Sequence, residues 1–580
     1  MLPGRIVNMN KRKRLLPLSA ALLFTASVAL PSCSGTASSS DEIVLNVYNS
    51  ADYIKEDADE INDESDKGLV HQFEDYCEET YHQKVRINYS TFDTNETMLS
   101  ELKTGKADYD LVNCSDYVVQ KMINEDMIIP FDDDSTPNYT KYVSPFVNEK
   151  IDSIAVNGKT GIVGKYARGY MWGTLGILYN DAFQGLAKRG ITSEEMEEDM
   201  TSWDSLWDPK YKNLLSIKDS VRDTYAVGIF ETYKDDFTLD GKSYKGFATL
   251  MKEYDAGSIS EEEYNKEITT IFNFCDDDTL NVVGAKLREL RDNAFGFEVD
   301  SGKVDMIKGD KFAINVAWSG DAAYAMDQAD EYNQSGTIDG EKVDDTSKNY
   351  VDLKYALPET GANIWFDAWV MPKGANKLWA SRFVDFLSTP KYAAENMEYI
   401  GYTPVIAGDE ILQLVQSWYD ARYDEDKGEM DYDSIKPSDE GFDDDYYTKD
   451  ISYFFKGTLD SMEDSDAVFL LEKESRNKQF DTQYPDESLL PHLTIMADFG
   501  SQNASMLLMW ESVKNTSLPT WAYYFILAIL VLILLLIVLL QVSRHAVKKR
   551  RKERKEAREA AHKLRVQQLR QEQKEQKKSA

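Results

Sequence analysis

Short apolar runs alternate with amphipathic stretches between residues 41 and 514. Residues 42–48 (EIVLNVY) and 84–89 (KVRINY) are rich in β-branched and aromatic residues, which predicts two strands. Between them, residues 69–81 carry apolar side chains at a spacing of four, which predicts a helix. Further strands are predicted at residues 108–113, 214–218 and 312–317, and a further helix at residues 118–127. This alternation predicts an α/β fold with a largely parallel sheet.

Two long stretches are dense in charged residues and predict additions to this α/β framework. Residues 235–299 predict mainly helices, and residues 424–481 predict acidic surface helices and loops. Neither stretch predicts a domain with a separate function.

The first 33 residues have the pattern of a signal peptide. Basic residues 11–14 precede an apolar run over residues 15–30, and Cys33 follows shortly after. This ending is similar to a bacterial lipobox, in which the cysteine thiol is lipidated; ordinary cleavage beside an incidental cysteine is the alternative. Residues 34–41 are rich in small polar residues and predict a flexible tether.

Residues 521–542 form an apolar run with the length of a membrane-spanning helix and aromatic residues at one edge. The flank that follows, residues 543–580, is strongly basic and free of proline and glycine. It predicts a charged helical tail, which the positive-inside rule places in the cytoplasm. The acidic middle of the chain is then predicted to lie outside the membrane.

The charge of the chain is divided in the same way. The 580 residues contain 65 Lys and Arg against 101 Asp and Glu, a formal net charge of −36. Residues 34–543 carry a net charge of −51, whereas residues 544–580 carry +10. Phosphate backbones would repel so acidic a domain, which argues against nucleic acid as its partner.

The motifs of the common enzyme classes are missing from the sequence. The five histidines are scattered, and no phosphate-binding loop, nucleophile elbow or dinucleotide fingerprint occurs. Cys77, Cys114 and Cys275 have no zinc-site spacing and allow at most one disulfide. A carboxylate pair for glycoside hydrolysis has no local signature and stays open. We therefore expect no enzyme, no metal site and no cofactor.

Aromatic and acidic residues gather where the predicted strands end. The four places are Ser115 and Tyr117, residues 219–223, residues 318–321, and residues 364–367 after a turn. In open α/β sheets, ligands bind in the crevice beyond the carboxyl ends of the strands. Aromatic faces beside carboxylates suit a flexible organic cation, whose ammonium groups bond to carboxylates while its methylenes stack on rings. Sugars bind a similar combination, so these residues alone do not identify the ligand.

Six segments in a common order resemble the spermidine/putrescine-binding proteins of bacterial polyamine ABC importers. They are residues 90–98, 171–176, 202–209, 365–367, 401–404 and 484–486. The resemblance implies a two-lobed, type II periplasmic-binding-protein-like clamshell. It assigns residues 42–165 and 364–410 to lobe 1, and residues 166–363 and 411–515 to lobe 2.

The same resemblance implies a set of ligand contacts. In the first lobe these are Tyr53, Ser115 and Tyr117; in the second lobe or at the crossings they are Asp223, Trp318, Trp365, Asp367 and Tyr402. Asp223 and Asp367 would hold ammonium groups, and the rings would pack against methylenes. Ser50 and Asp219 are further candidates, at positions where the chain departs from the family, and this departure leaves the choice among polyamines open.

The resemblance further implies the substrate-binding component of an ABC importer, which takes a polyamine between its lobes and delivers it to a permease. Its partners would be the polyamine, the permease subunits and the lipid bilayer, with the binding domain on the extracytoplasmic face of a bacterial cell membrane. An alternative is a membrane-anchored ligand sensor or assembly subunit of the same fold that binds another small organic cation. A third alternative is an acidic extracellular hydrolase.

Overall fold

The computed structural model describes residues 42–578 apart from residues 59, 106–107, 133, 299, 339, 343–349, 439–440 and 516–519. The predicted signal peptide, tether and Cys33 lie outside the described residues, as do the last two residues of the predicted tail. The chain divides into two compact units, one that ends at Lys514 and one that begins at Asn515, and each is considered by itself.

Twelve strands within the described residues form the main sheet of the first unit. Eight of them follow the order β2 (Val85–Phe92), β1 (Ile43–Ser50), β3 (Leu111–Ser115), β14 (Ala362–Pro372), β5 (Ala167–Asn180), β10 (Ile314–Trp318), β6 (Leu215–Lys218) and β9 (Gly296–Glu298). The others are β4 (Ile128–Ile129), β13 (Leu353–Ala356), β15 (Thr403–Pro404) and β20 (Leu493–Thr494), which pair with β5 or β14. The fold is therefore of the predicted mixed α/β class.

The sheet is parallel toward both ends and antiparallel at its centre. β1 pairs parallel with β2 and β3, and β6 pairs parallel with β9 and β10. In contrast, β5 and β14 run antiparallel to each other, and each also runs antiparallel to its other neighbour on the path. The largely parallel sheet expected from the sequence is thus wrong at the centre, because two long strands are inserted there between the parallel groups.

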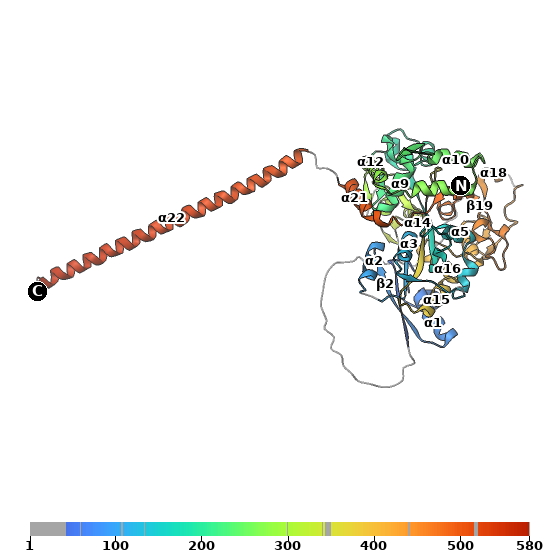
Figure 1. The fold of residues 1–580 in the computed structure, drawn as a ribbon, viewed down its shortest axis with the longest axis horizontal. Helices are drawn as coiled ribbons and strands as arrows, with labels where there is room; N and C mark the ends of the chain where they lie inside the picture. The colour runs from blue at the N-terminus through green and yellow to red at the C-terminus, as the bar shows by residue number, and fades with distance from the viewer. Residues whose placement is uncertain are drawn as a thin grey trace. The chain divides into compact units, whose positions relative to one another are not determined.

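Helices cover the two ends of this unit. In Figure 1, α1 (Leu69–Tyr81), α2 (Asn95–Thr104) and α15 (Lys377–Leu387) lie at one end. At the other end lie α9 (Val221–Thr232), α10 (Phe247–Asp255) and α12 (Asp277–Asn293). One apolar cluster includes Phe73 of α1 and Phe383 of α15, while a larger cluster includes Ile229 of α9 and Val283 of α12. Burial of these apolar faces is the main favourable term that holds the helices on the sheet.

Most of the remaining longer helices of this unit connect strands, and the last of them follows the final strand. They are α3 (Asp116–Asn124), α5 (Pro145–Ser153), α11 (Glu261–Phe272), α13 (Asp300–Lys308), α14 (Ser319–Ser335), α16 (Pro390–Ile400), α17 (Asp409–Tyr419) and α21 (Asn503–Lys514). The helix predicted over residues 69–81 is confirmed as α1. The helix predicted over 118–127 is confirmed as α3, which starts two residues earlier and ends three residues earlier than predicted. Strong amphipathic spacing explains why both were visible in the sequence.

The stretch 424–481 is less peripheral than expected. It contains the hairpin formed by β18 (Tyr446–Asp450) and β19 (Val468–Glu472). Phe454, Phe469 and Phe480 from this stretch are fully or almost fully buried in the large apolar cluster. The acidic composition hid these aromatic positions, which make the stretch an integral part of the core.

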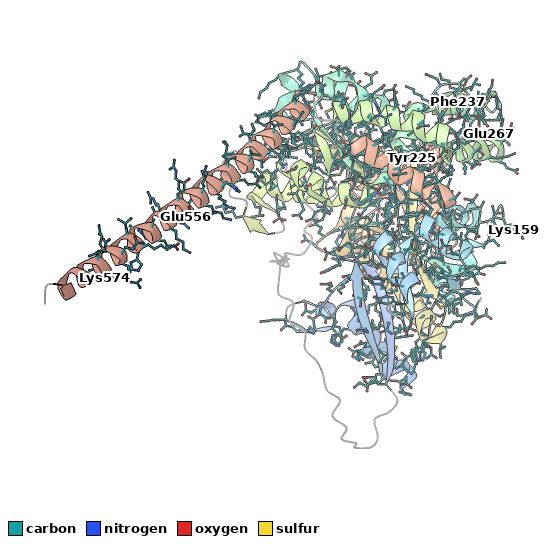
Figure 2. All side chains as sticks on the ribbon, turned by 60° about the vertical axis from the view of Figure 1, so that its left-hand side comes forward. Lys159, Tyr225, Phe237, Glu267, Glu556 and Lys574 are labelled. Carbon is teal, nitrogen blue, oxygen red and sulfur yellow. The ribbon has the colours of Figure 1, made fainter. Side chains whose placement is uncertain are left out.

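The second unit contains one long helix, α22 (Thr520–Lys578). By length and composition it holds one segment apolar enough to cross a membrane, and none of that segment is buried within the chain. Farther along, charged side chains such as Glu556 and Lys574 project from α22 (Figure 2), and Glu556 lies 4.0 Å from Lys552. The predicted apolar helix is thus present within α22.

Candidate ligand-binding site

A cavity of about 3010 Å³ lies in the first unit. All ten candidate residues from the sequence line it: Ser50, Tyr53, Ser115, Tyr117, Asp219, Asp223, Trp318, Trp365, Asp367 and Tyr402. They are separated by up to about 350 positions in the sequence, and only the folding of the sheet brings them to one cavity.

Three strand-to-helix junctions supply half of these side chains. β3 leads directly into α3 at Ser115, β6 leads into α9 through Asp219 and Ser220, and β10 leads into α14 at Trp318. At the second junction the Ser220 side chain caps α9 by accepting a hydrogen bond from the backbone N–H of Asp223. The junctions place polar side chains at strand ends, as the sequence predicted for three of the four places.

Trp365 and Asp367 differ from that expectation, because they lie inside β14 and not after a strand. β14 is paired with β5 on one side and with β3 on the other, and Asp367 lies opposite Ser115 in the register. The pairing with β5 shifts between Asp367 and Ala368, a bulge of the kind that re-aims a side chain. The expected loop position was therefore wrong, although both residues do line the cavity.

The carboxyl group of Asp367 is half-buried in the wall of the cavity. Its Oδ2 accepts a hydrogen bond of 2.9 Å from the hydroxyl of Tyr53, and Ser115 also bonds to it. Burial raises the pKa of Asp367, these hydrogen bonds lower it in part, and the nearby charge of Asp223 raises it further. A cation placed here would relieve the cost of holding this carboxylate in a buried site.

Aromatic rings form the wall beside Asp367. The ring centres of Tyr53 and Tyr402 are 5.5 Å apart in an edge-to-face arrangement, and those of Trp365 and Tyr402 are 5.9 Å apart. Behind Trp365 stands Gly173 of β5, its partner in the strand register. A Cβ atom on Gly173 would lie 2.5 Å from the Trp365 ring, so the glycine permits the close approach of the indole.

Asp223 provides a second carboxylate at a different junction. Its Oδ1 accepts a hydrogen bond of 3.1 Å from Nε1 of Trp318. Lys218 contacts the face of the same indole ring, with its Nζ 3.7 Å from the ring centre. Trp318 is therefore held by its edge and by its face, which fixes the aromatic surface that it offers to the cavity.

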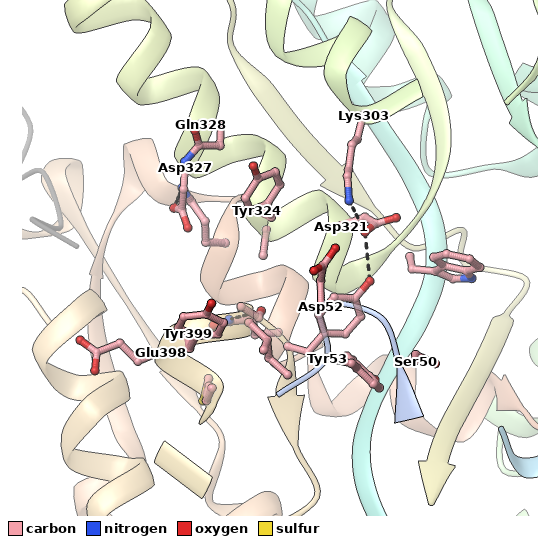
Figure 3. A pocket seen from close by; sticks show the side chains of 18 of the residues that line it. Ser50, Asp52, Tyr53, Lys303, Asp321, Tyr324, Asp327, Gln328, Glu398 and Tyr399 are labelled. Atoms are coloured by element: carbon pink, nitrogen blue, oxygen red, sulfur yellow. Dashed lines mark hydrogen bonds and ion pairs between the residues drawn. The ribbon is translucent and has the colours of Figure 1, made fainter. Parts of the chain in front are cut away.

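Asp321 is the main participant outside the ten candidate residues, although it belongs to the strand-end group 318–321 identified in the sequence. Its Oδ2 accepts 2.8 Å from Nζ of Lys218, and its Oδ1 accepts 3.3 Å from Nζ of Lys303 and 3.0 Å from the hydroxyl of Tyr402. Figure 3 shows Lys303 directed at Asp321. Burial raises the pKa of Asp321, but the two lysine charges outweigh it and bring the net pKa well below its usual range. Its position three residues after Trp318, close to the end of β10, was the feature of the sequence that could have indicated a place in the site.

The remaining candidates occupy the rim and the first junction. Arg222 stacks on Tyr117 at 3.7 Å from the ring centre, and the Tyr117 hydroxyl donates 3.4 Å to Glu96. Asp219 pairs with Lys514 at 3.2 Å. Asp219 is therefore already matched by a cation of the chain, whereas no lysine or arginine ion pair to Asp367 or Asp223 occurs among the described residues.

The side chains around the cavity have the chemistry that an organic cation requires. Two carboxylates, Asp223 and Asp367, face a cavity walled by indole and phenol rings, which attract ammonium groups and cover methylenes. No group of three or more potential metal ligands occurs in the described part of the chain, where Cys77, Cys114 and Cys275 are free thiols.

Comparisons with known proteins agree with a solute-binding role. The family model described as bacterial extracellular solute-binding protein matches residues 69–410. The spermidine/putrescine-binding periplasmic protein of Salmonella typhimurium is 27% identical over 398 residues, which cover 68% of this chain and 86% of that protein. The putrescine-binding periplasmic protein PotF of Escherichia coli is 24% identical over 379 residues, covering 64% and 81%.

Among solved structures, a putative spermidine/putrescine ABC transporter protein from Listeria monocytogenes shares 24% identity with this chain. It covers 81% of this chain and 98% of its own, with a TM-score of 0.48. The family match spans more than half of the 580 residues and includes seven of the eight ligand contacts implied by the sequence. The chain is therefore a member of the bacterial extracellular solute-binding proteins, a family of binding proteins and not of enzymes.

Proposed function

We propose that this chain binds polyamines such as putrescine and spermidine and serves as the substrate-binding component of an ABC importer. The observation that carries the proposal is the pair Asp223 and Asp367, two carboxylates without a lysine or arginine partner among the described ion pairs, in a cavity lined by Trp318, Trp365 and Tyr402. The names of the polyamine-binding relatives support the same ligand class.

Ligand capture in this proposal couples to closure of two lobes. The cavity volume of about 3010 Å³ exceeds the roughly 300–1,000 Å³ of ordinary small-molecule pockets, so a polyamine would leave most of it empty. Residues of the cavity come from both parallel groups of the sheet, from β1 and β3 on one side and from β10 and the residues that follow β6 on the other. A cation that contacts both groups would favour the closed state through its differential affinity.

The proposed location is the extracytoplasmic face of a bacterial cell membrane. The apolar part of α22 would span the bilayer, the basic residues after it would lie in the cytoplasm, and Cys33 would carry a lipid. The bound polyamine would pass to permease subunits in the same membrane. The acidic surface of the first unit would raise the local concentration of polycations near the site.

A second candidate function keeps the fold and the cation site but uses α22 for signalling or assembly. The observation that favours it is the length of α22, which continues as a charged helix to Lys578, well past its apolar part. Removal of the residues after Arg551 separates the two functions. Polyamine uptake that survives this removal supports the importer, and uptake that is lost supports a role for the tail.

Calorimetric titration of the full chain in detergent with putrescine and spermidine tests the ligand class. We expect saturable binding that falls at least about tenfold in Asp367→Asn and in Asp223→Asn, because each loses a charged hydrogen-bond partner for an ammonium group. No heat of binding for either amine at millimolar concentration would exclude polyamines as the ligand.

The matched control is Asp93→Asn, which removes the same charge from an exposed residue that also lines the cavity. Its affinity is expected to stay within about twofold of the unmodified chain, since an exposed charge is screened by water and salt. An equal loss of affinity in all three variants would show that Asp223 and Asp367 act only through the negative charge of the cavity and not through specific contacts with the ligand.

A further inference from the structure

One end of the cavity already holds ammonium groups that belong to the chain itself. Asp321 is almost completely buried, and both of its oxygens are bonded, Oδ2 to Lys218 and Oδ1 to Lys303 and Tyr402. A carboxylate bonded in this way has little capacity left for an ammonium group from a ligand.

The two lysines differ in their access to the cavity. The Lys218 side chain is 2% exposed and lies behind the face of Trp318. The Lys303 side chain is 27% exposed and lines the cavity beside Tyr324, with Nζ 5.3 Å from the centre of that ring. Lys218 is thus buried and does not line the cavity, whereas Lys303 lines the cavity and occupies space that a ligand could reach.

The surroundings of the Lys303 ammonium group match those that a ligand ammonium requires. They comprise a carboxylate, an aromatic ring and a cavity wall formed by the ligand residues Trp318 and Tyr402. The same combination occurs at Asp367, where Tyr53 takes the place of Tyr402 and no lysine is paired with the carboxylate among the described ion pairs. The cavity therefore contains two similar cation positions, one open and one filled by a side chain.

We propose that Lys303 is a specificity-determining residue whose ammonium group fills an amine subsite at Asp321, so that the site favours a diamine over a triamine. This inference rests on the proposed polyamine function. A diamine would use the open carboxylates Asp367 and Asp223. The additional ammonium group of a triamine would meet the positive charge of Lys303 and find Asp321 already neutralised.

The test measures the dissociation constants of putrescine and spermidine for the full chain and for four variants, Lys303→Met, Lys303→Gln, Lys303→Arg and Lys478→Met. In Lys303→Met the ratio of the spermidine constant to the putrescine constant is expected to fall about tenfold, the effect of one charged hydrogen bond. Lys303→Arg keeps the charge and should leave the ratio unchanged. Lys303→Gln keeps the polarity without the charge, and it should shift the ratio as Lys303→Met does.

Lys478→Met is the matched control, because Lys478 lines the same cavity with a 21% exposed side chain and bonds to Asp352 instead of Asp321. A shift of equal size in Lys478→Met, or an unchanged ratio in Lys303→Met and Lys303→Gln with putrescine still bound, would overturn the role of Lys303 alone. Failure of every protein to bind either amine would overturn the proposed function and this role with it.

Discussion

Buried carboxyl groups around the cavity differ in the cations that face them. Asp321 has two lysines, whereas the cation near Asp116 is the more distant Arg222. The backbone N–H groups of Phe366, at 3.1 Å, and of Tyr117 also bond to Asp116. Burial raises the pKa of Asp116 to about 7, with a further increase from Asp367 that Arg222 opposes in part. The nearby lysines thus keep Asp321 ionised, whereas Asp116, without a lysine partner, titrates near neutrality.

Asp116→Asn is expected to make the stability of the ligand-free chain less dependent on pH. The folded-state pKa of about 7 lies above the unfolded value near 4, so between these values the folded state binds more protons. This group's contribution to the free energy of unfolding therefore falls as pH rises from about 4 to about 7, by at most about 1.4 kcal/mol per pH unit. Melting temperatures at about pH 5 and about pH 8 measure this effect. The melting temperature of the variant relative to that of the unmodified chain should be higher at about pH 8 than at about pH 5.

Asp93→Asn serves as the comparison, because Asp93 is exposed. The difference in melting temperature between this variant and the unmodified chain should be the same at both pH values. If Asp116→Asn behaves in the same way, the carboxyl group of Asp116 does not titrate in this range.

At this scale the sequence could indicate residue types but not their pairings. Trp318, Asp223 and Asp367 were visible because aromatic and acidic residues stand together near predicted strand ends. The pairing of Lys218 with Asp321 joins residues 103 positions apart, and no local pattern contains it. For the same reason the sequence could not show which acids of the cavity remain open to a ligand and which are already neutralised.

Among the elements, β5 and β14 determine the position of Trp365. Gly173 of β5 faces Trp365 in the register, and a Cβ atom there would also lie 2.5 Å from Oγ of Ser319 at the start of α14. Both contacts would have to shift to accommodate a methyl group.

Gly173→Ala is therefore expected to displace Trp365 toward the cavity, with a loss of stability of roughly 1–3 kcal/mol and a weaker affinity for the ligand. Thermal unfolding and calorimetric titration measure the two effects. Gly296→Ala in β9 is the control, since no atom lies within 4 Å of a Cβ built there and its φ is not positive. An unaltered affinity in Gly173→Ala would show that the Trp365 indole does not depend on this glycine.

Elements with strong periodicity could be predicted, and elements fixed by tertiary pairing could not. The helix α1 keeps its apolar side chains on one face, so spacing alone revealed it. β14 begins at Ala362 where a turn was expected to be followed by loop residues, because its pairing with β3 and β5 overrides the local turn signal. The hairpin of β18 and β19 was hidden by the surrounding acidic residues for a similar reason.

For the whole molecule, the sequence predicts two independent attachments to the membrane. The apolar part of α22 is one, and a lipid on Cys33 is the other. Either attachment suffices to retain a protein at the bilayer if the lipidation adds more than one acyl chain.

We expect a chain truncated after Lys514 to remain in the membrane fraction, and likewise a Cys33→Ala chain. Only the combination of the two changes should release the protein, as measured by immunoblots of membrane and soluble fractions. The released protein should keep its amine affinity, because the first unit contains the whole cavity. Release by truncation alone would contradict the attachment through Cys33, and release by Cys33→Ala alone would contradict the membrane span.

The central strand β5 lies between the two parallel groups of the sheet and pairs toward each of them. Its 14 residues extend over about 46 Å; the part up to Thr174 pairs with β14, and the part from Leu175 pairs with β10. If the two groups rotate against each other as proposed, we expect part of the rotation to be absorbed at this peptide, where the Thr174 N–H donates 3.2 Å to the hydroxyl of Ser319. Amide hydrogen exchange at Thr174 would consequently report ligand capture directly, without a label and for a ligand of any chemical identity.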